Sequence, residues 1–189
     1  TRVASDAGIV IVAAAGNDGR TNALMGPACV SSTLSVSAVR DPGPQVQPTF
    51  YGCSDAYMGS GYIPCFANVA SFLDVVAPGT VIDHTGFSVG NIVSSSTSMA
   101  AAHASGVAAL TAGYNSTESA TSWAKRVAYG GSSAYNLRDN KSYRMLHAVG
   151  SIMSCTAASE FVDSFDYTGG PGSVVVDVAP STCQFNVTK

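Results

Sequence analysis

The stretch IVSSSTSMAAAHASGVAAL, residues 92–110, sets a polar run of serine and threonine directly before a run of alanine. Alanine is the strongest helix former, and a helix with such small side chains lets neighbouring elements approach closely on every side. The stretch therefore predicts a central helix that begins at Thr97 and Ser98. At that N-terminus, free backbone N–H groups and the helix dipole favour negative charge. A serine there either caps the helix or attacks a carbonyl whose developing charge those groups stabilise.

The segments before this helix are typical of strands buried in a parallel sheet. Each is a short apolar run that ends near proline or glycine, and the three are AGIVIVAAAGN (7–17), LSVSAV (34–39) and SFLDVVAPG (71–79). We expect the helix that precedes the first of them to lie before Thr1. A second helix is expected from Thr117 to Val127, and SYRMLHAV (142–149) is expected to form a strand or the start of a helix. The sequence thus predicts an α/β fold, a mostly parallel sheet with helices on both faces.

The composition excludes several classes of protein. The 189 residues are 46% apolar and 11% charged, so the chain can bury a sizeable core. The net charge of −3 gives no basic stripe for nucleic acid, and no apolar run approaches the roughly 18 residues of a membrane span. We therefore expect neither nucleic acid nor a membrane as a partner. Residues 1–150 are expected to form one domain, followed by a β-rich extension of unknown role over residues 151–189, which contains the alternating segment SVVVDV.

The five cysteines favour disulfides over a metal site, because they lack the paired C-x-x-C units of zinc sites. Turn-rich segments with few apolar residues lie between the cysteines that we expect to pair, which are Cys53 with Cys65 and Cys155 with Cys183. The first pair would pin the long loop of residues 40–65. Cys29 is left over, as a free thiol or with a partner in sequence outside this chain. Disulfides suit a secreted protein, as do the glycosylation sequons at Asn115, Asn140 and Asn186.

Three motifs in this order and spacing resemble those of the subtilisin-like serine proteases, or subtilases. They are the strand-end asparagine of VAAAGNDG (12–19), the loop DVVAPG (74–79) and the helix start TSMAAAHASG (97–106). Smaller matches, in PACVSSTLSVSAV and CFANVASFLDVVAPG, extend the resemblance over roughly residues 5 to 150. The resemblance implies a subtilisin-like fold that is incomplete at its N-terminus.

The resemblance also implies a serine endopeptidase that forms an acyl-enzyme on Ser98. The side-chain amide of Asn17 and the backbone N–H of Ser98 would then stabilise the oxyanion of the tetrahedral intermediate. The alternative for Asn17 is a turn residue after a strand, and the alternative for Ser98 is a helix cap.

A substrate pocket is implied next to these residues. Its walls would be Ala14, Ala15 and Gly16, with Gly26 near the floor and Asp18 at the rim, and such small residues leave room for a large apolar side chain. Asp74 corresponds to a weak cation site in some subtilases, but one carboxylate is poor support for a metal. We expect no metal and no cofactor in this chain, with calcium an option only for the complete domain.

Two positions depart from the family motif. Ala102 stands where the family has proline, a mild change in the first turns of a helix. Ser96 stands where the family has glycine. If that position required a positive φ or a close approach to substrate, the serine side chain would cost about 1 kcal/mol or more and would crowd the cleft.

The aspartate and histidine of the catalytic triad are missing. Neither of the family motifs that carry them, D-[ST]-G and H-G-T-H, occurs here. His103 lies about 140° around the helix from Ser98 and resembles a buried structural histidine of the family. His84 is expected in an exposed loop, and His147 lies beyond the motifs. We therefore expect the chain to be the C-terminal portion of a catalytic domain, inactive alone, with a polypeptide substrate and the missing N-terminal portion as its partners.

One further motif match is disfavoured, and one alternative function stays open. SWAK (122–125) matches the S-x-x-K motif of penicillin-binding enzymes, but the companion motifs S-D-N and K-T-G are absent and surface-helix spacing explains it. A non-catalytic subtilase-like module that binds peptides or proteins is the second alternative, and Ser96 would then reflect relaxed catalytic constraint. The retained Ser98 and Asn17 favour the protease.

Overall fold

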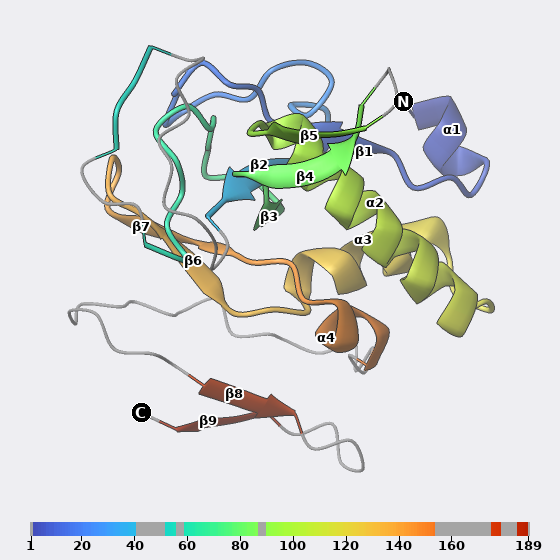
Figure 1. Cartoon of the computed structure of the whole chain (residues 1–189). Coiled ribbons are helices and arrows are strands. Elements are labelled where there is room, and N and C mark those ends of the chain that lie inside the picture. Colours follow the sequence, from blue (N-terminus) through green and yellow to red (C-terminus); the bar gives the residue numbers. More distant parts are fainter. Residues whose placement is uncertain are drawn as a thin grey trace.

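A computed structural model describes residues 2–40, 52–55, 59–86, 90–153, 175–178 and 185–188 (Figure 1). Its centre is a parallel sheet of three strands in the order β1 (Val12–Ala14), β2 (Leu34–Val39) and β3 (Val75–Pro78). In the register, Val36 of β2 lies between Ala14 of β1 and Val75 of β3. All six residues of β2 are buried. The three predicted strands are therefore confirmed, with β1 and β3 shorter than their apolar runs.

Helix α2 (Thr97–Tyr114) packs against all three strands. Its contact face is made of small side chains, among them Ala100 and Ala104, both 0% exposed. Because these side chains are so short, the helix backbone lies close to the sheet. The predicted helix is confirmed, and it begins at the predicted residue.

The segment that contains Asn68 lies against the opposite face of the sheet. Ala38 of β2 lies near Ala100 of α2, since both would touch a side chain placed at Gly79. Successive strand residues point to opposite faces, so Ser37 points away from α2. Its hydroxyl donates to the backbone carbonyl of Asn68 at 2.6 Å. The segment that contains Asn68 is thus tied to the back of the sheet.

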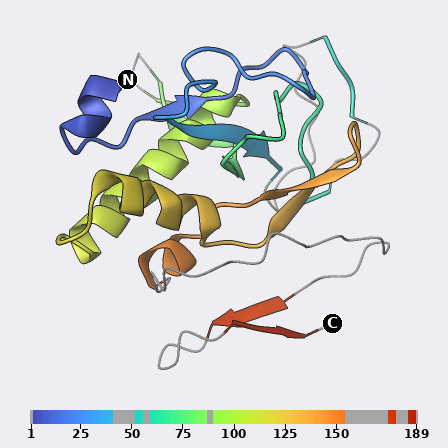
Figure 2. The same cartoon turned by 180° about the vertical axis from the view of Figure 1, so that it is seen from behind.

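Two further helices pack beside α2. Helix α3 (Ala120–Tyr129) contacts α2, and both views of the chain place the two side by side (Figures 1 and 2). Helix α4 (Ala148–Met153) contacts both of them. Ser119 caps α3, so the helix begins three residues after the predicted Thr117, because the Ser119 hydroxyl accepts the N–H of Ser122 at 3.2 Å.

The remaining elements are short. Helix α1 (Arg2–Asp6) immediately precedes β1, whereas the sequence predicted that this helix would lie before Thr1. The other strands form antiparallel pairs: β4 (Ile82–Thr85) with β5 (Asn91–Ser94), β6 (Ser133–Asn136) with β7 (Lys141–Arg144), and β8 (Val175–Val178) with β9 (Phe185–Thr188). The segment 142–149 therefore supplies both a strand and a helix start. The pair β8–β9 agrees with a β-rich extension, and the domain boundary at residue 150 stays a prediction.

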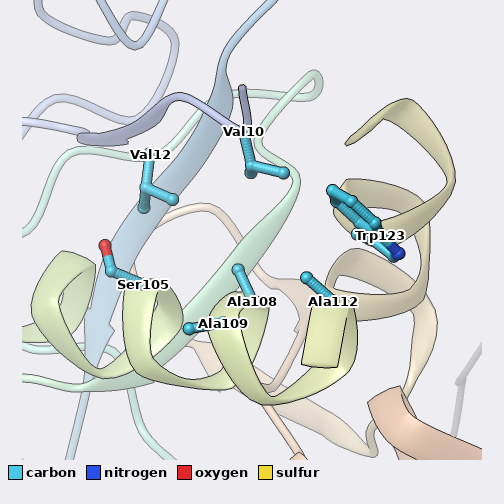
Figure 3. Close-up of a pocket in the computed structure, with 7 residues that line it drawn as sticks. All are labelled: Val10, Val12, Ser105, Ala108, Ala109, Ala112 and Trp123. Atoms are coloured by element: carbon cyan, nitrogen blue, oxygen red, sulfur yellow. The ribbon is translucent and has the colours of Figure 1, made fainter. Parts of the chain in front are cut away.

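Helix α2 is not buried on every side, as the sequence had suggested. Leu110 is 57% exposed, and Ala102, Ser105 and Ala109 are exposed as well. Beside this face runs a groove of about 300 Å³ (Figure 3), lined by Val10, Val12, Ser105, Ala108, Ala109, Ala112 and Trp123. Among the described residues, α2 is thus covered by the sheet and by α3 and α4, and its remaining face is exposed.

The disulfide between Cys53 and Cys65 is present as predicted, with the two Cα atoms 6.0 Å apart. Cys29 is free, also as predicted, and it is exposed. The expected pair Cys155–Cys183 lies outside the described residues. In the described ranges, no helix is both long enough and apolar enough to cross a membrane.

Candidate active site

The N-terminus of α2 is fixed by its capping residue and by the end of β3. Ser96 is the cap, and its hydroxyl accepts the N–H of Met99 at 3.3 Å. The N–H of Ser96 donates to the carbonyl of Gly79, directly after β3, at 2.8 Å. A side chain at Gly79 would lie 2.9 Å from the Ser96 carbonyl oxygen and 2.6 Å from the Ala38 side chain. Glycine is therefore required here for the helix start to approach the sheet closely.

The end of β1 holds the same helix turn from the other side. The Asn17 side-chain oxygen Oδ1 accepts two hydrogen bonds from Thr97, from the backbone N–H at 2.9 Å and from the hydroxyl at 3.0 Å. The N–H of Gly16 in turn donates to the Thr97 hydroxyl at 3.2 Å. Thr97 is completely buried. These bonds orient the Asn17 amide, because Oδ1 is held by Thr97 and the direction of Nδ2 is thereby set.

Two N–H donors at this helix start have no partner within the part of the chain that the structure describes. One is Nδ2 of Asn17 and the other is the backbone N–H of Ser98. The neighbouring helix N–H groups are satisfied, since Thr97 donates to Asn17 and Met99 donates to Ser96. A helix start with unpaired N–H groups and a positive dipole end is suited to bind an oxyanion.

Ser98 itself is exposed, although it follows the buried Thr97 in the chain. No hydrogen bond or other contact of its hydroxyl is found among the described residues. The capping role belongs to Ser96, and Ser98 is the second residue of the helix. Of the two roles that the sequence left open for Ser98, helix capping is thus taken by another residue.

Ser96 shows no backbone strain. Its φ of −171° and ψ of 164° are extended values that any residue adopts. Of the two conditions under which serine would be costly here, a positive φ is therefore not met. A close approach to substrate stays a prediction. Its side chain is half-buried and satisfies a helix N–H, which a glycine could not do.

None of the three histidines of the chain is hydrogen-bonded to Ser98 in the described structure. His103 is exposed rather than buried, because it lies on the uncovered side of α2, and its Nδ1 bonds to the Met99 carbonyl at 3.0 Å. His84 lies in strand β4 rather than in a loop, with its Nε2 2.8 Å from the Ser94 hydroxyl. His147 accepts the N–H of Gly150 at 2.9 Å. Among the residues described, none of these histidines is therefore placed to act as the base that takes a proton from Ser98.

The predicted pocket residues lie along the end of β1. Ala15 is buried, Ala14 is half-buried, and Gly16 has a φ of +102°. A side chain at Gly16 would lie 2.3 Å from Cγ of Met25, whose N–H donates to the Ala15 carbonyl at 2.8 Å. Gly26 is exposed, with nothing within 4 Å of its Cβ position. The residue packed against Gly16 is thus Met25, which sequence reasoning missed.

Asn68 and Arg138 are the other residues that the sequence did not single out. Asn68 is 0% exposed and binds the loop after β1 through both ends of its amide. Arg138 donates to the carbonyls of Gly19 and Ala67 at 2.8 and 2.6 Å. Burial lowers the pKa of Arg138, and the charges of Asp139 and Asp55 oppose that shift. A lone asparagine inside the apolar run CFANVA was the available signal for Asn68.

Asp74, at the expected weak cation position, is hydrogen-bonded to β2 of the sheet. Its Oδ2 accepts both the N–H and the hydroxyl of Ser35, each at 2.7 Å. Among the described residues no group of three or more metal-ligating side chains is found. The expectation of calcium in the complete domain stays a prediction.

Comparison with known protein families identifies the family of this chain. The family model of the subtilase family matches residues 2–159, so the chain belongs to the subtilase family. No curated protein sequence matches it.

Solved structures match over most of the chain. A structure described as the prenylagaramide maturation protease PagA has a TM-score of 0.60 at 22% identity, covering 80% of this chain and 52% of its own. A cold-adapted subtilisin-like serine proteinase has a TM-score of 0.60 at 23% identity, covering 78% of this chain and 48% of its own. At such identities the likeness concerns the fold. This chain spans about half the length of the solved structures it matches.

Proposed function

We propose that this chain carries the nucleophile and the oxyanion hole of a serine endopeptidase, with Ser98 as the nucleophile. The observation that supports this most is the pair of unpaired donors beside Ser98, Nδ2 of Asn17 and the Ser98 N–H. Membership of the subtilase family supports a serine peptidase in general.

The chemistry requires both donors. When the Ser98 hydroxyl attacks the carbonyl carbon of a peptide bond, the carbonyl oxygen becomes negative and the intermediate tetrahedral. Donors that are already oriented stabilise this charge as it forms, without a cost of reorganisation. In subtilisin itself, removing the corresponding asparagine costs about 10²–10³-fold in kcat, and we expect a loss of the same order here.

The base must come from outside this chain. A serine hydroxyl is a weak nucleophile at neutral pH without one, and the three histidines each bind other groups. We propose that an upstream portion of the same catalytic domain supplies the aspartate and histidine. It is also the partner that would cover the exposed side of α2 and the groove of Figure 3.

The substrate would be a polypeptide, bound with one apolar side chain beside Ala14, Ala15 and Gly16. Met25 is 47% exposed and its side chain is of a flexible type, so it would set how deep that pocket is. A secreted location is supported by the disulfide between Cys53 and Cys65. We also propose that the complete domain can bind calcium, and we assign no residue of this chain as its ligand.

A non-catalytic peptide-binding module is the second candidate. Ser96 favours it, since a hydroxyl-bearing side chain stands where the family motif has glycine. Intact D-[ST]-G and H-G-T-H motifs upstream would support the protease, and their loss would support the binding module.

Labelling with a fluorophosphonate probe tests the proposal. Residues 1–189 alone should not react, whereas the complete mature protein should be labelled at Ser98 and its Ser98→Ala variant should not. Strong labelling of residues 1–189 at Ser98 would overturn the argument that the base is missing. No labelling of a folded complete protein would favour the binding module.

A further inference from the structure

The side chain of Asn68 makes every hydrogen bond that an asparagine amide can make. Its Oδ1 accepts the N–H groups of Asp18 and Arg20 at 3.0 and 2.9 Å. Its Nδ2 donates to the carbonyl of Ala15 at 3.2 Å and to the Asp18 carboxylate at 3.1 Å. An amide has two acceptor and two donor positions, so this one is saturated.

These bonds enclose the loop that carries Asn17. Their partners lie at residues 15, 18 and 20, on both sides of Asn17 in the chain. The backbone N–H of Asn68 adds a bond to the Gly16 carbonyl at 3.0 Å. At Gly16 a side chain would lie 2.5 Å from Nδ2 of Asn68, so the loop passes closely over the amide. The loop is folded around Asn68.

Asn68 is itself held by the rigid part of the molecule. Its carbonyl accepts the hydroxyl of Ser37, a fully buried residue of β2. Arg138 binds the preceding carbonyl, of Ala67, and also that of Gly19 in the loop. The position of Asn68 is therefore set by the sheet, and the loop takes its position from Asn68.

We propose that Asn68 is a positioning residue that aims the Asn17 amide at the oxyanion, an inference that rests on the role proposed above for Asn17. Asn68 holds the loop of residues 15–20 in place. That loop carries Asn17, whose Oδ1 accepts the Thr97 N–H. Because Nδ2 of Asn17 has no partner to hold it among the described residues, its direction depends on the loop and on Thr97.

The isosteric variant Asn68→Asp separates positioning from packing. The carboxylate introduced by this change still accepts from the Asp18 and Arg20 N–H groups, but it cannot donate the two bonds of the amide and it faces the carboxylate of Asp18. The paired change Asp18→Asn returns a donor to that contact. Combining Asn68→Asp with Asp18→Asn should thus recover part of what Asn68→Asp loses.

Amide hydrogen exchange in residues 1–189 tests the positioning without any activity. Thr97 is the first residue of α2, so its N–H has no helical partner and is protected by Asn17. In Asn68→Asp, exchange at Thr97 should quicken at least about tenfold relative to Val107 in the same helix. The control Asn115→Ala, in unglycosylated protein, removes two bonds at the far end of α2 and should leave Thr97 unchanged. An equal acceleration of all amides, or none at Thr97, would show that Asn68 is merely structural.

Kinetics of the complete protein test the consequence. Asn68→Asp should lower kcat about ten- to a hundredfold with KM within about twofold, since misplaced groups cost transition-state stabilisation. Added to Asn17→Ala it should lower kcat no further, because both changes act through one amide. An additive loss would overturn the proposal for Asn68. If Asn17→Ala itself left kcat unchanged, the role of Asn17 would be wrong, and the exchange result would still decide whether Asn68 positions it.

Discussion

The two sides of α2 differ in how they are held. On the side of the candidate site, polar groups that are buried or half-buried join the helix start to the ends of β1 and β3, through Asn17, Thr97 and Gly79. On the other side, the helix presents serine and alanine side chains to a groove that no described residue fills. The helix start is thus fixed by hydrogen bonds, whereas the groove side of the helix is lined by small side chains.

This difference has a physical reason. Hydrogen bonds fix directions, which a catalytic donor needs, whereas small side chains fix only how closely something else can approach. The hydrogen bonds of Asn17, Thr97 and Gly79 that fix the helix start already lie within this chain. The upstream portion proposed above would add the contacts that the groove side of α2 lacks among the described residues. Substitutions on the two sides should therefore change the unfolding free energy by different amounts and in different directions.

The largest effect is expected for the disulfide that supports the bonded side. Cys65 precedes Phe66, whose carbonyl accepts the N–H of Gly19 at 2.7 Å. Replacing Cys53 and Cys65 by serine should lower the free energy of unfolding by about 3 kcal/mol, because the unfolded chain loses a closed loop. Urea unfolding of residues 1–189 measures this, with Cys29→Ser, a change of an exposed free thiol, as a neutral control. Equal effects of the two changes would contradict the prediction.

Gly79→Ala should come next, with a loss of at least about 2 kcal/mol in unfolding free energy. The added methyl group would lie 2.6 Å from the Ala38 side chain and 2.9 Å from the Ser96 carbonyl, so the helix start must move away from β2. Thermal unfolding measures the loss. A stability equal to that of the unchanged protein would mean that the helix start is not held as tightly as the contacts indicate.

On the exposed side of α2, replacing glycine by alanine should raise the unfolding free energy instead of lowering it. Gly106 lies in α2 with nothing within 4 Å of its Cβ position. Gly106→Ala should therefore stabilise residues 1–189 by about 0.5–1 kcal/mol, the difference in helix propensity. The reverse change at the exposed Ala109, Ala109→Gly, should destabilise by a similar amount. A destabilising Gly106→Ala in this chain would show that the side is already covered.

The smallest effect concerns the pH dependence of α3. Hydrogen bonds from Arg126 and then Ser122 hold the pKa of Glu118 below its usual value. A lowered carboxyl pKa stabilises the fold above the unfolded pKa of 4.5, and that contribution is lost as the pH falls through the lowered value. Glu118→Gln should cost less than about 1 kcal/mol at pH 7, and the cost should vanish in acid. A pH-independent cost would contradict this account.

The sequence predicted the elements of this fold better than its boundaries. The apolar runs and the alanine-rich stretch gave β1, β2, β3 and α2, because burial and helix propensity act on local sequence. The start of α3 was misplaced because Thr117 and Ser119 are both good caps, and only tertiary packing chooses between them. The exposure of His103 could not be predicted, since it depends on what else covers α2.

The sequence predicted those candidate-site residues that belong to a local motif. The sequence pointed to Asn17, to Ser98 and to the loop 74–79 because each lies at the end of an element with a recognisable pattern. It did not point to Asn68 or Met25, because their importance lies in contacts with a loop that local patterns do not connect to them. A side chain that acts only through a long-range hydrogen bond leaves no local pattern to read.

The most direct test of the oxyanion site is the structure of the complete protein after reaction with a fluorophosphonate. The phosphonyl oxygen stands in for the oxyanion of the tetrahedral intermediate. The account predicts a bond from phosphorus to Ser98 Oγ, with that oxygen about 2.7–3.1 Å from both Asn17 Nδ2 and the Ser98 backbone nitrogen. A phosphonyl oxygen that is held by other donors, with the Asn17 amide turned away from it, would contradict the account.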